Sequence, residues 1–187
     1  KRYKFNFSNL NNNDVLSLQE DASNNLLIGT NGSGLFKLNL KTFKVDRILN
    51  SEKDKRQILI NSLIKTKQGK TFVGTNIGLK EVDVLNNKLI DSRAFGIENN
   101  KISSSIESLF LDNENNLWAG SQTNKGVFKC KLSSDRNNNI LAVQNLKFSS
   151  KKIMDIVQLK DSTMLIGTEN DGLFHLDKNN TVIKNYR

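Results

Sequence analysis

Two side chains in this sequence are of the types that most often do nucleophilic, acid–base or metal chemistry: the single histidine, His175, and the single cysteine, Cys130. A hydrolase or a zinc centre needs several such groups that converge, and neither a Ser-His pair nor a two-His spacing accompanies these two residues. We therefore expect no catalytic residue, no metal site and no cofactor in this segment.

Other polar stretches have a weaker resemblance to binding loops. Asp112-x-Glu114-x-Asn116 and Asp135-x-Asn137-x-Asn139 alternate oxygen ligands as a calcium loop does, but both lack the glycine and the terminal glutamate of an EF-hand loop. The glycine-rich run 29–34 resembles a phosphate loop, yet no helix follows it. We interpret all three as turns.

A repeat must position any site in this chain. One short pattern of apolar residues, glycine and a hydroxyl residue occurs four times, as Leu26-Leu27-Ile28-Gly29-Thr30, Thr71-Phe72-Val73-Gly74-Thr75, Leu117-Trp118-Ala119-Gly120-Ser121 and Met164-Leu165-Ile166-Gly167-Thr168. The four glycines are 45, 46 and 47 residues apart. A period of this length indicates that each repeat is one structural unit.

Each repeat predicts four short strands joined by hairpin-length turns. The predicted strands are 15–18, the strand through Gly29, 35–38 and 45–49; 60–65, 72–75, 78–83 and 89–94; 106–111, 117–121, 126–132 and 140–148; and 153–159, 164–168, 172–177 and 182–186. No segment has a helical period over ten or more residues. The predicted fold is an all-β propeller with four antiparallel four-stranded blades.

The repeat register assigns roles to single residues. The slot of Trp118 is filled by Leu27, Phe72 and Leu165, which indicates packing of one blade on the next rather than catalysis. Cys130 takes a core slot filled elsewhere by Leu38, Val82 and Leu176. His175 takes the slot of Lys37, Glu81 and Lys129, so we expect it to face solvent or a polar surface between blades.

The blade count predicts an arc of a larger propeller. We expect one propeller segment over 1–187, with blades at 14–50, 58–95, 104–148 and 153–187. Residues 1–13 would be the outer strand of a preceding blade and a linker, because Tyr3, Phe5 and Phe7 alternate with polar residues while the last repeat already has its own fourth strand. A closed ring of four blades remains the alternative.

Charge is concentrated in one stretch of the chain. The formal net charge is +9, and residues 41–70 contain nine Lys or Arg against three acids, a net of +6. Such a field attracts polyanions or simply keeps a surface solvated. No apolar run approaches the roughly 18 to 20 residues that cross a bilayer.

The repeats resemble the two-component regulator propeller repeat. The likeness covers the chain from Asp14 onward and is strongest in residues 112–121 and 165–174. It implies the periplasmic sensor ectodomain of a hybrid two-component system, in a protein anchored in the inner membrane that detects an oligosaccharide and signals to a histidine kinase. The resemblance also implies a propeller of seven blades. The remaining blades and a homodimer of the full-length sensor are the other implied partners. The tryptophan is absent from three repeats, which leaves those units as weaker matches.

Propellers bind ligands at the end of the ring where blade connections and second-to-third strand turns gather. The residues that we expect there, with cations for a sulfated or uronic-acid sugar and amides for hydroxyl groups, are Lys53, Lys55, Arg56, Lys101, Asn124, Lys125, Lys151, Lys152 and Asn170. A non-catalytic scaffold for protein–protein interaction in a secreted or periplasmic protein is the second reading. Nucleic-acid binding is third, because the basic stretch lacks interleaved aromatic residues.

Overall fold

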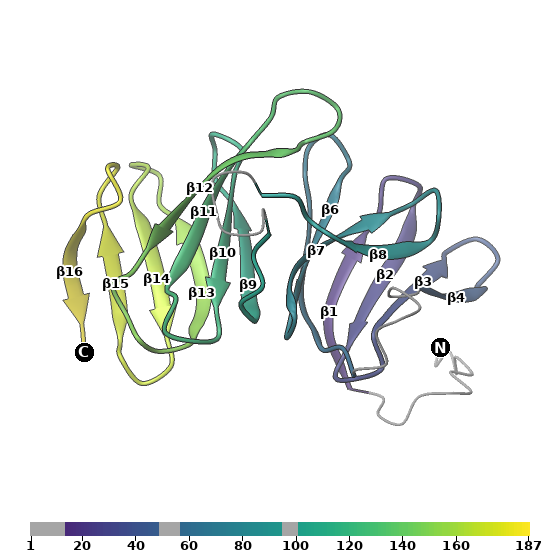
Figure 1. Cartoon of the computed structure of the whole chain (residues 1–187), viewed down its shortest axis with the longest axis horizontal. Coiled ribbons are helices and arrows are strands. Elements are labelled where there is room, and N and C mark those ends of the chain that lie inside the picture. The colour runs from purple at the N-terminus through teal and green to yellow at the C-terminus, as the bar shows by residue number, and fades with distance from the viewer. Residues whose placement is uncertain (1–13, 49–56, 95–100) are drawn as a thin grey trace.

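The computed structural model describes residues 14–48, 57–94 and 101–187, which form sixteen strands in four antiparallel sheets (Figure 1). The described ranges contain no helix long and apolar enough to cross a membrane. The strand that the sequence predicts near the N-terminus falls within 1–13 and lies outside the described residues.

The sixteen strands follow the four repeats. The first sheet contains β1 (Val15–Glu20), β2 (Asn25–Thr30), β3 (Leu35–Asn39) and β4 (Val45–Ile48). The second contains β5 (Ile60–Lys65), β6 (Thr71–Thr75), β7 (Gly78–Asp83) and β8 (Lys88–Asp91). The third contains β9 (Ile106–Leu111), β10 (Asn116–Ser121), β11 (Val127–Leu132) and β12 (Ile140–Leu146). The fourth contains β13 (Ile153–Gln158), β14 (Met164–Thr168), β15 (Leu173–Leu176) and β16 (Val182–Tyr186).

Strands are adjacent in chain order within every sheet, and the first strands β1, β5, β9 and β13 contact one another in succession. This arrangement confirms the predicted all-β class with four antiparallel blades. Several predicted strands are too long, among them 126–132, 140–148, 153–159 and 172–177. The largest excess is in 89–94: β8 ends at Asp91, and Ala94 instead forms an isolated parallel bridge with Ile140 of the third sheet.

Asparagine supplies the turn geometry in this proline-free sequence. Six non-glycine residues with a positive φ are asparagines, at Asn24, Asn87, Asn115, Asn138, Asn170 and Asn180. Asn tolerates the left-handed region better than other side chains because it hydrogen-bonds locally. The turns between strands therefore form without Pro.

Apolar contacts between neighbouring sheets make up most of the core. One cluster joins the first and second sheets around Leu27 and Ile60, another joins the second and third around Phe72 and Ile106, and a third joins the third and fourth around Trp118 and Ile153. None of the core clusters among the described residues combines the first sheet with the fourth. The four sheets are therefore an open arc rather than a closed ring of four (Figure 1).

Candidate ligand-binding surfaces

One end of the arc is built from repeated backbone hydrogen bonds. In every sheet the amide that follows the second strand donates to the carbonyl that precedes the first strand, in the pairs Asn31–Asp14 (3.0 Å), Asn76–Leu59 (3.4 Å), Gln122–Ser105 (2.8 Å) and Glu169–Lys152 (2.9 Å). We call this the connection end and define it as turns 31–34, 76–77, 122–126 and 169–172 with entry segments 57–59, 101–105 and 147–152. The repeat thus gathers its most variable segments on one side.

The described members of the predicted ligand set lie at the connection end. Lys101, Asn124, Lys125, Lys151 and Asn170 are exposed, whereas Lys152 is half-buried. The hydrogen bond from Glu169 to Lys152 brings the turn of Asn170 beside the segment of Lys151 and Lys152, and that from Gln122 to Ser105 brings the turn of Asn124 and Lys125 beside the segment of Lys101. Lys53, Lys55 and Arg56 lie outside the described residues.

Carboxylates neutralise part of this set. Lys152 Nζ lies 2.7 Å from Glu107 Oε1, and Lys101 Nζ lies 3.7 Å from Oδ2 of Asp91, whose Oδ1 contacts Lys80. Lys125 and Lys151 make no ion pair with any residue in the described ranges. These two lysines are therefore the predicted cations most available to an anionic ligand.

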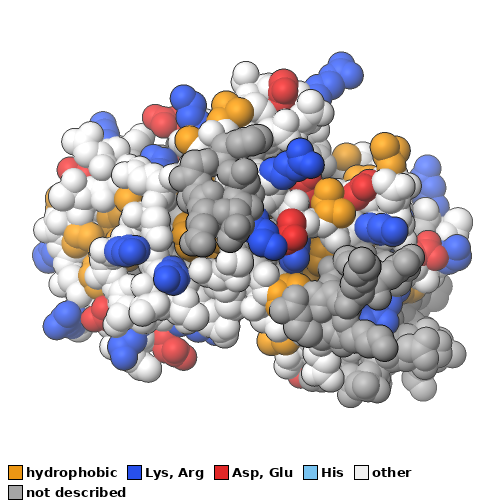
Figure 2. Space-filling model, in the orientation of Figure 1, with side chains coloured by type: hydrophobic (Ala, Val, Ile, Leu, Met, Phe, Trp, Pro, Cys, Tyr) orange, Lys and Arg blue, Asp and Glu red, His pale blue; other side chains and the backbone are white. Residues whose placement is uncertain are grey.

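A further carboxylate lies beside Asn170. Asp171 accepts a hydrogen bond from Ser149 Oγ at 2.9 Å and contacts Arg187 Nη2 at 3.4 Å. On the face shown in Figure 2, acidic and basic side chains are interspersed rather than separated into one basic patch. At the connection end, the ion pairs of Lys101, Lys152 and Arg187 likewise break up the positive field.

The repeat register did not predict Glu107, Asp91 and Asp171 as partners. Glu107 occupies a slot that is Leu16, Asn61 and Met154 in the other sheets. A repeat pattern identifies positions that agree, so it gives no information at a position where all four copies differ.

A small cavity lies on the opposite side of the arc, between the first two sheets. Its lining is apolar with a few polar groups and consists of Asp21, Ala22, Ser23, Leu27, Lys37, Ile48, Gly69, Thr71, Val82, Val84 and Asn87. Lys37 Nζ donates to Asn87 Oδ1 at 2.8 Å across this interface. Asp21 is buried and caps its own turn, since its Oδ1 accepts the amides of Ser23 (2.7 Å) and Asn25 (2.9 Å).

The third and fourth sheets show what fills the equivalent space there. Trp118 Nε1 donates to Asp112 Oδ2 at 2.9 Å, and Lys129 Nζ lies 4.8 Å from the centroid of the indole ring. Lys129 also reaches Asn180 Oδ1 of the fourth sheet at 3.3 Å. The first sheet keeps the aspartate and the lysine but has Leu27 in place of the tryptophan. The first repeat thus combines Asp21 with Leu27 where the third combines Asp112 with Trp118, and this difference in the sequence could have indicated the cavity.

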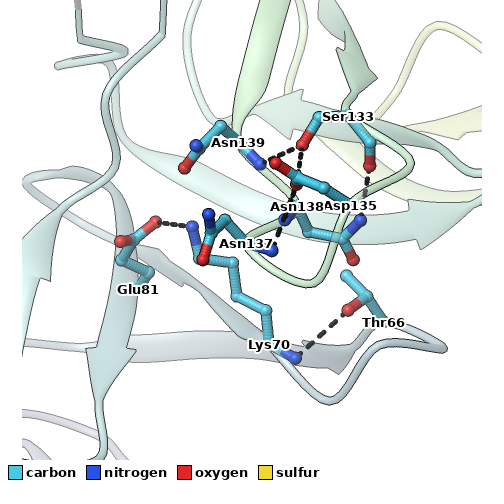
Figure 3. Close-up of polar contacts among 8 residues, drawn as sticks. All are labelled: Thr66, Lys70, Glu81, Ser133, Asp135, Asn137, Asn138 and Asn139. Atoms are coloured by element: carbon cyan, nitrogen blue, oxygen red, sulfur yellow. Dashed lines mark hydrogen bonds and ion pairs between the residues drawn. The ribbon is translucent and has the colours of Figure 1, made fainter.

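The long turn between β11 and β12 packs against the second sheet (Figure 3). Asp135 accepts Ser133 Oγ at 2.6 Å and the amides of Asn137 (3.1 Å) and Asn138 (3.2 Å), and these bonds, that from Ser133 foremost, lower the pKa of Asp135. Lys70 pairs with Glu81 at 2.8 Å beside this turn. The carboxylate therefore holds a turn together, and the described residues include no cluster of three or more His, Cys, Asp or Glu able to hold a metal ion.

The two residues with reactive side-chain types serve structural roles. Burial raises the pKa of the Cys130 thiol to about 12, so the thiol is an unreactive member of the core. Thr163 Oγ1 donates to Asp161 Oδ1 at 2.7 Å and lowers the pKa of Asp161. Because the hydroxyl proton is used there, His175 Nε2 donates to Thr163 Oγ1 at 2.9 Å.

Comparison with known proteins supports the repeat assignment. Residues 9–32 match the family model described as the two component regulator propeller, which confirms the resemblance seen in the repeats. No curated protein sequence matches the chain.

Similar solved structures are propellers with larger chains. The extracellular domain of BT4673 from B. thetaiotaomicron, which is assigned to the hybrid two component systems, superposes with a TM-score of 0.70 at 20% identity over 90% of this chain and 22% of its own. PorZ, a surface component of the type-IX secretion system of Porphyromonas gingivalis, gives 0.64 at 14% identity over 100% of this chain and 29% of its own. Virginiamycin B lyase from Staphylococcus aureus superposes with a TM-score of 0.67 at 8% identity, over 94% of this chain and 56% of its own. At these identities the likeness shows the fold, and this chain spans less than two thirds of the length of each.

Proposed function

We propose that this chain is part of the extracytoplasmic sensor propeller of a hybrid two-component system. The observation that carries the proposal is the two component regulator propeller repeat at residues 9–32, together with a fold that matches such an extracellular domain over 90% of the chain. The parent protein would be anchored in the inner membrane as a homodimer, with further blades in its periplasmic propeller, and would signal to a histidine kinase.

The proposed ligand is an oligosaccharide bound at the connection end. Asn124 and Asn170 offer exposed amides that suit sugar hydroxyl groups, and Lys125 and Lys151 offer cations without a carboxylate partner among the described residues. Charge-assisted hydrogen bonds from these lysines would favour a sulfated or uronic-acid sugar over a neutral one. The predicted Lys53, Lys55 and Arg56 would add to the same end.

Calorimetry of the intact ectodomain with neutral and sulfated oligosaccharides tests this function. We expect tighter binding of the sulfated sugar, weakening as salt rises. A Lys125→Ala/Lys151→Ala variant should lose affinity for the sulfated sugar and part of the salt dependence. Lys178→Ala, an exposed lysine in the β15–β16 turn, is the matched control and should leave both unchanged. Tighter binding of the neutral sugar would contradict the anionic version.

A non-catalytic scaffold in a secreted or periplasmic protein is the second candidate. It is favoured by the match to PorZ, a surface secretion component, over 100% of this chain. Sequencing the gene beyond residue 187 separates the two candidates, since a membrane helix and a histidine kinase downstream support the sensor and their absence supports the scaffold.

A further inference from the structure

The face of the fourth sheet that points away from the third sheet is unlike any internal face. Cross-strand partners point to the same side of a sheet, so the strand pairing defines two rows of side chains on this face: Asp155, Gly167, Leu173 and Tyr186, and Val157, Leu165, His175 and Lys184. Tyr186 is 44% exposed and Val157 46% exposed. We call these eight residues the open face.

The third sheet shows what normally covers these rows. Its corresponding residues are Ser108, Gly120, Val127 and Leu146, and Phe110, Trp118, Lys129 and Gln144. Four of them, Phe110, Trp118, Val127 and Leu146, share one apolar cluster with Ile153 and other residues of the fourth sheet, and Trp118 and Val127 are 1% and 0% exposed. The first and second sheets are covered in the same way, by Ile60 and Ile106 of the sheets that follow.

The glycine in the second strand of each sheet has no side chain and so leaves a small space on these faces, which we call the socket. A Cβ placed on Gly29, Gly74 or Gly120 would lie 2.5 to 2.9 Å from Cγ2 of Ile60, Ile106 or Ile153 of the following sheet. At Gly167 the nearest atom is the carbonyl oxygen of Asp155, 4.0 Å away. The fourth sheet therefore retains the socket, and no described side chain fills it.

One hydrogen-bonding group differs on the open face. Ser17 Oγ donates to Ile60 O at 3.0 Å, and Ser108 Oγ donates to Ile153 O at 3.1 Å, so these two serines bind a backbone carbonyl of the following sheet, whereas Ser62 at the same position of the second sheet makes no such bond. Asp155 stands at this position in the fourth sheet, and its Oδ1 accepts the amide of Ile156 at 2.8 Å. An ionised carboxylate accepts hydrogen bonds only, so it repels a carbonyl and requires a donor.

His175 indicates a second polar contact of the missing neighbour. Lys37 and Lys129, which occupy the same row position, each donate to an asparagine in the turn between the third and fourth strands of the next sheet, Asn87 and Asn180. His175 already uses Nε2 for Thr163, and its other ring nitrogen is left for such a turn.

We propose that the open face docks a further blade of the same repeat, whose first strand places an isoleucine or valine in the Gly167 socket and presents a hydrogen-bond donor to Asp155. The three internal interfaces define this occupant, because each covers the same rows with the same element. The inference rests on the further blades of the proposed propeller and does not involve the ligand, so its failure would remove those blades from the proposal, whereas the calorimetry tests ligand binding separately.

The experiment adds a second copy of residues 147–187 directly after Tyr186. Tyr186 is equivalent to Leu146, the residue after which the fourth repeat begins in the natural chain, so the added copy starts at the same point of its repeat. The added blade brings a copy of Ile153, whose carbonyl would face Asp155. Docking is followed by the thermal midpoint of unfolding and by fluorescence of a dye that binds exposed apolar surface. We expect the extension to raise the midpoint and reduce dye binding, and to do so more strongly in an Asp155→Asn variant, whose amide can donate to that carbonyl as Ser108 does.

Gly167→Val is the matched test of the socket. It should remove the gain from both extended chains while leaving the midpoint of the unextended chain unchanged, because Gly167 faces open space there. An extended Asp155→Asn chain with the midpoint and dye binding of the unextended chain would overturn the proposal, as would equal gains with and without Gly167→Val. Equal gains in the unaltered and Asp155→Asn extended chains would contradict the donor requirement.

If sedimentation velocity shows that the unextended chain dimerises and Gly167→Val abolishes the dimer, a second copy is the occupant and the proposal is wrong.

Discussion

Trp118 is the largest fully buried side chain and links a turn to an interface between sheets. Its ring fills the contact between the third and fourth sheets, and its N–H satisfies the buried carboxylate of Asp112. A buried indole generally needs such a partner for its polar group. The residue that marks the repeat in the sequence is therefore also the one that ties the turn before β10 to the neighbouring sheet.

The Trp118→Leu variant reproduces the combination of Leu27 and Asp21 found in the first sheet. We expect it to lower the free energy of unfolding by about 2–4 kcal/mol, because it leaves a cavity and removes one donor from a buried carboxylate. Denaturant unfolding followed by far-ultraviolet circular dichroism measures this. Asp112→Asn in the Trp118→Leu background should cost less than in the unaltered protein, and additive losses would contradict the coupling of the two side chains.

Cys130 should react with thiol reagents only when the protein unfolds. Burial raises the pKa of this thiol to about 12 from an ordinary value of 9.0, so the folded state disfavours the thiolate. The corresponding stabilisation is fully present below pH 9.0 and is lost as the pH rises from 9.0 toward 12. We expect the alkylation rate in native buffer to follow the global unfolding rate, with the denatured protein as the fast control. Rapid labelling of the native protein at neutral pH would contradict the buried position.

At the scale of the strand, the glycine in each second strand determines how closely two sheets approach. Gly120 lies against Ser108 and Ile153, whereas Gly167 is open, although the two glycines have the same sequence context. The sequence treats these positions as equivalent. Ser108 of the same sheet and Ile153 of the neighbouring sheet together leave no room for a side chain at Gly120, whereas neither contact has an equivalent at Gly167.

Gly120→Ala and Gly167→Ala form a matched pair. We expect Gly120→Ala to destabilise the protein by roughly 1–3 kcal/mol, since its Cβ would lie 2.3 Å from Ser108 Oγ and 2.6 Å from Ile153 Cγ2. Gly167→Ala should be neutral or stabilising by up to about 1 kcal/mol, because alanine restricts the unfolded chain more than glycine does. Equal losses in the two variants, measured by chemical denaturation, would show that the socket is not the reason for these glycines.

The turn of Asp135 should contribute to acid sensitivity. Its pKa is lowered, first by the hydrogen bond from Ser133, so its stabilising effect is present above the ordinary value of 3.8 and is lost as the pH falls through the lower, folded-state value. Asp135→Asn should therefore reduce stability at neutral pH and flatten the dependence of stability on pH below about 4. Unfolding midpoints at pH 7 and pH 3 measure this. Glu20→Gln, at an exposed position of β1, is the comparison and should leave that dependence in place.

For the molecule as a whole, the open arc makes stability uneven. The second and third sheets are covered on both faces, whereas β16 is mostly exposed and the open face of the fourth sheet is only partly covered. Repeat arrays derive stability from interfaces with their neighbours, so a sheet with one interface should open more easily than a sheet with two.

Hydrogen exchange should show this gradient. We expect backbone amides of β6 and β10, the second strands of the central sheets, to be protected more strongly than those of β14, the corresponding strand of the fourth sheet. In the extended chain proposed above, protection of β14 should rise. Uniform protection of all three strands in the unextended chain would contradict a stability set by neighbouring sheets.

Local spacing was sufficient to predict most of the fold and little of the site. The glycine period, the apolar second strands and the Asn-rich turns predicted four sheets of four strands, because strand patterning and turn chemistry act within about ten residues. Burial of Cys130 and the packing role of Trp118 also followed from comparing repeats, since equivalent positions in stacked units have equivalent surroundings.

Tertiary structure alone decided which charged groups neutralise one another and which faces lack a neighbour. The pairs Lys152–Glu107 and Lys101–Asp91 join separate elements, so no local pattern indicates them. The cavity beside Leu27 depends on how closely two sheets approach, and the open Gly167 socket depends on the absence of a packed neighbour among the described residues. These properties come from the distance between repeats in space, whereas the sequence of each repeat determines only the blade itself.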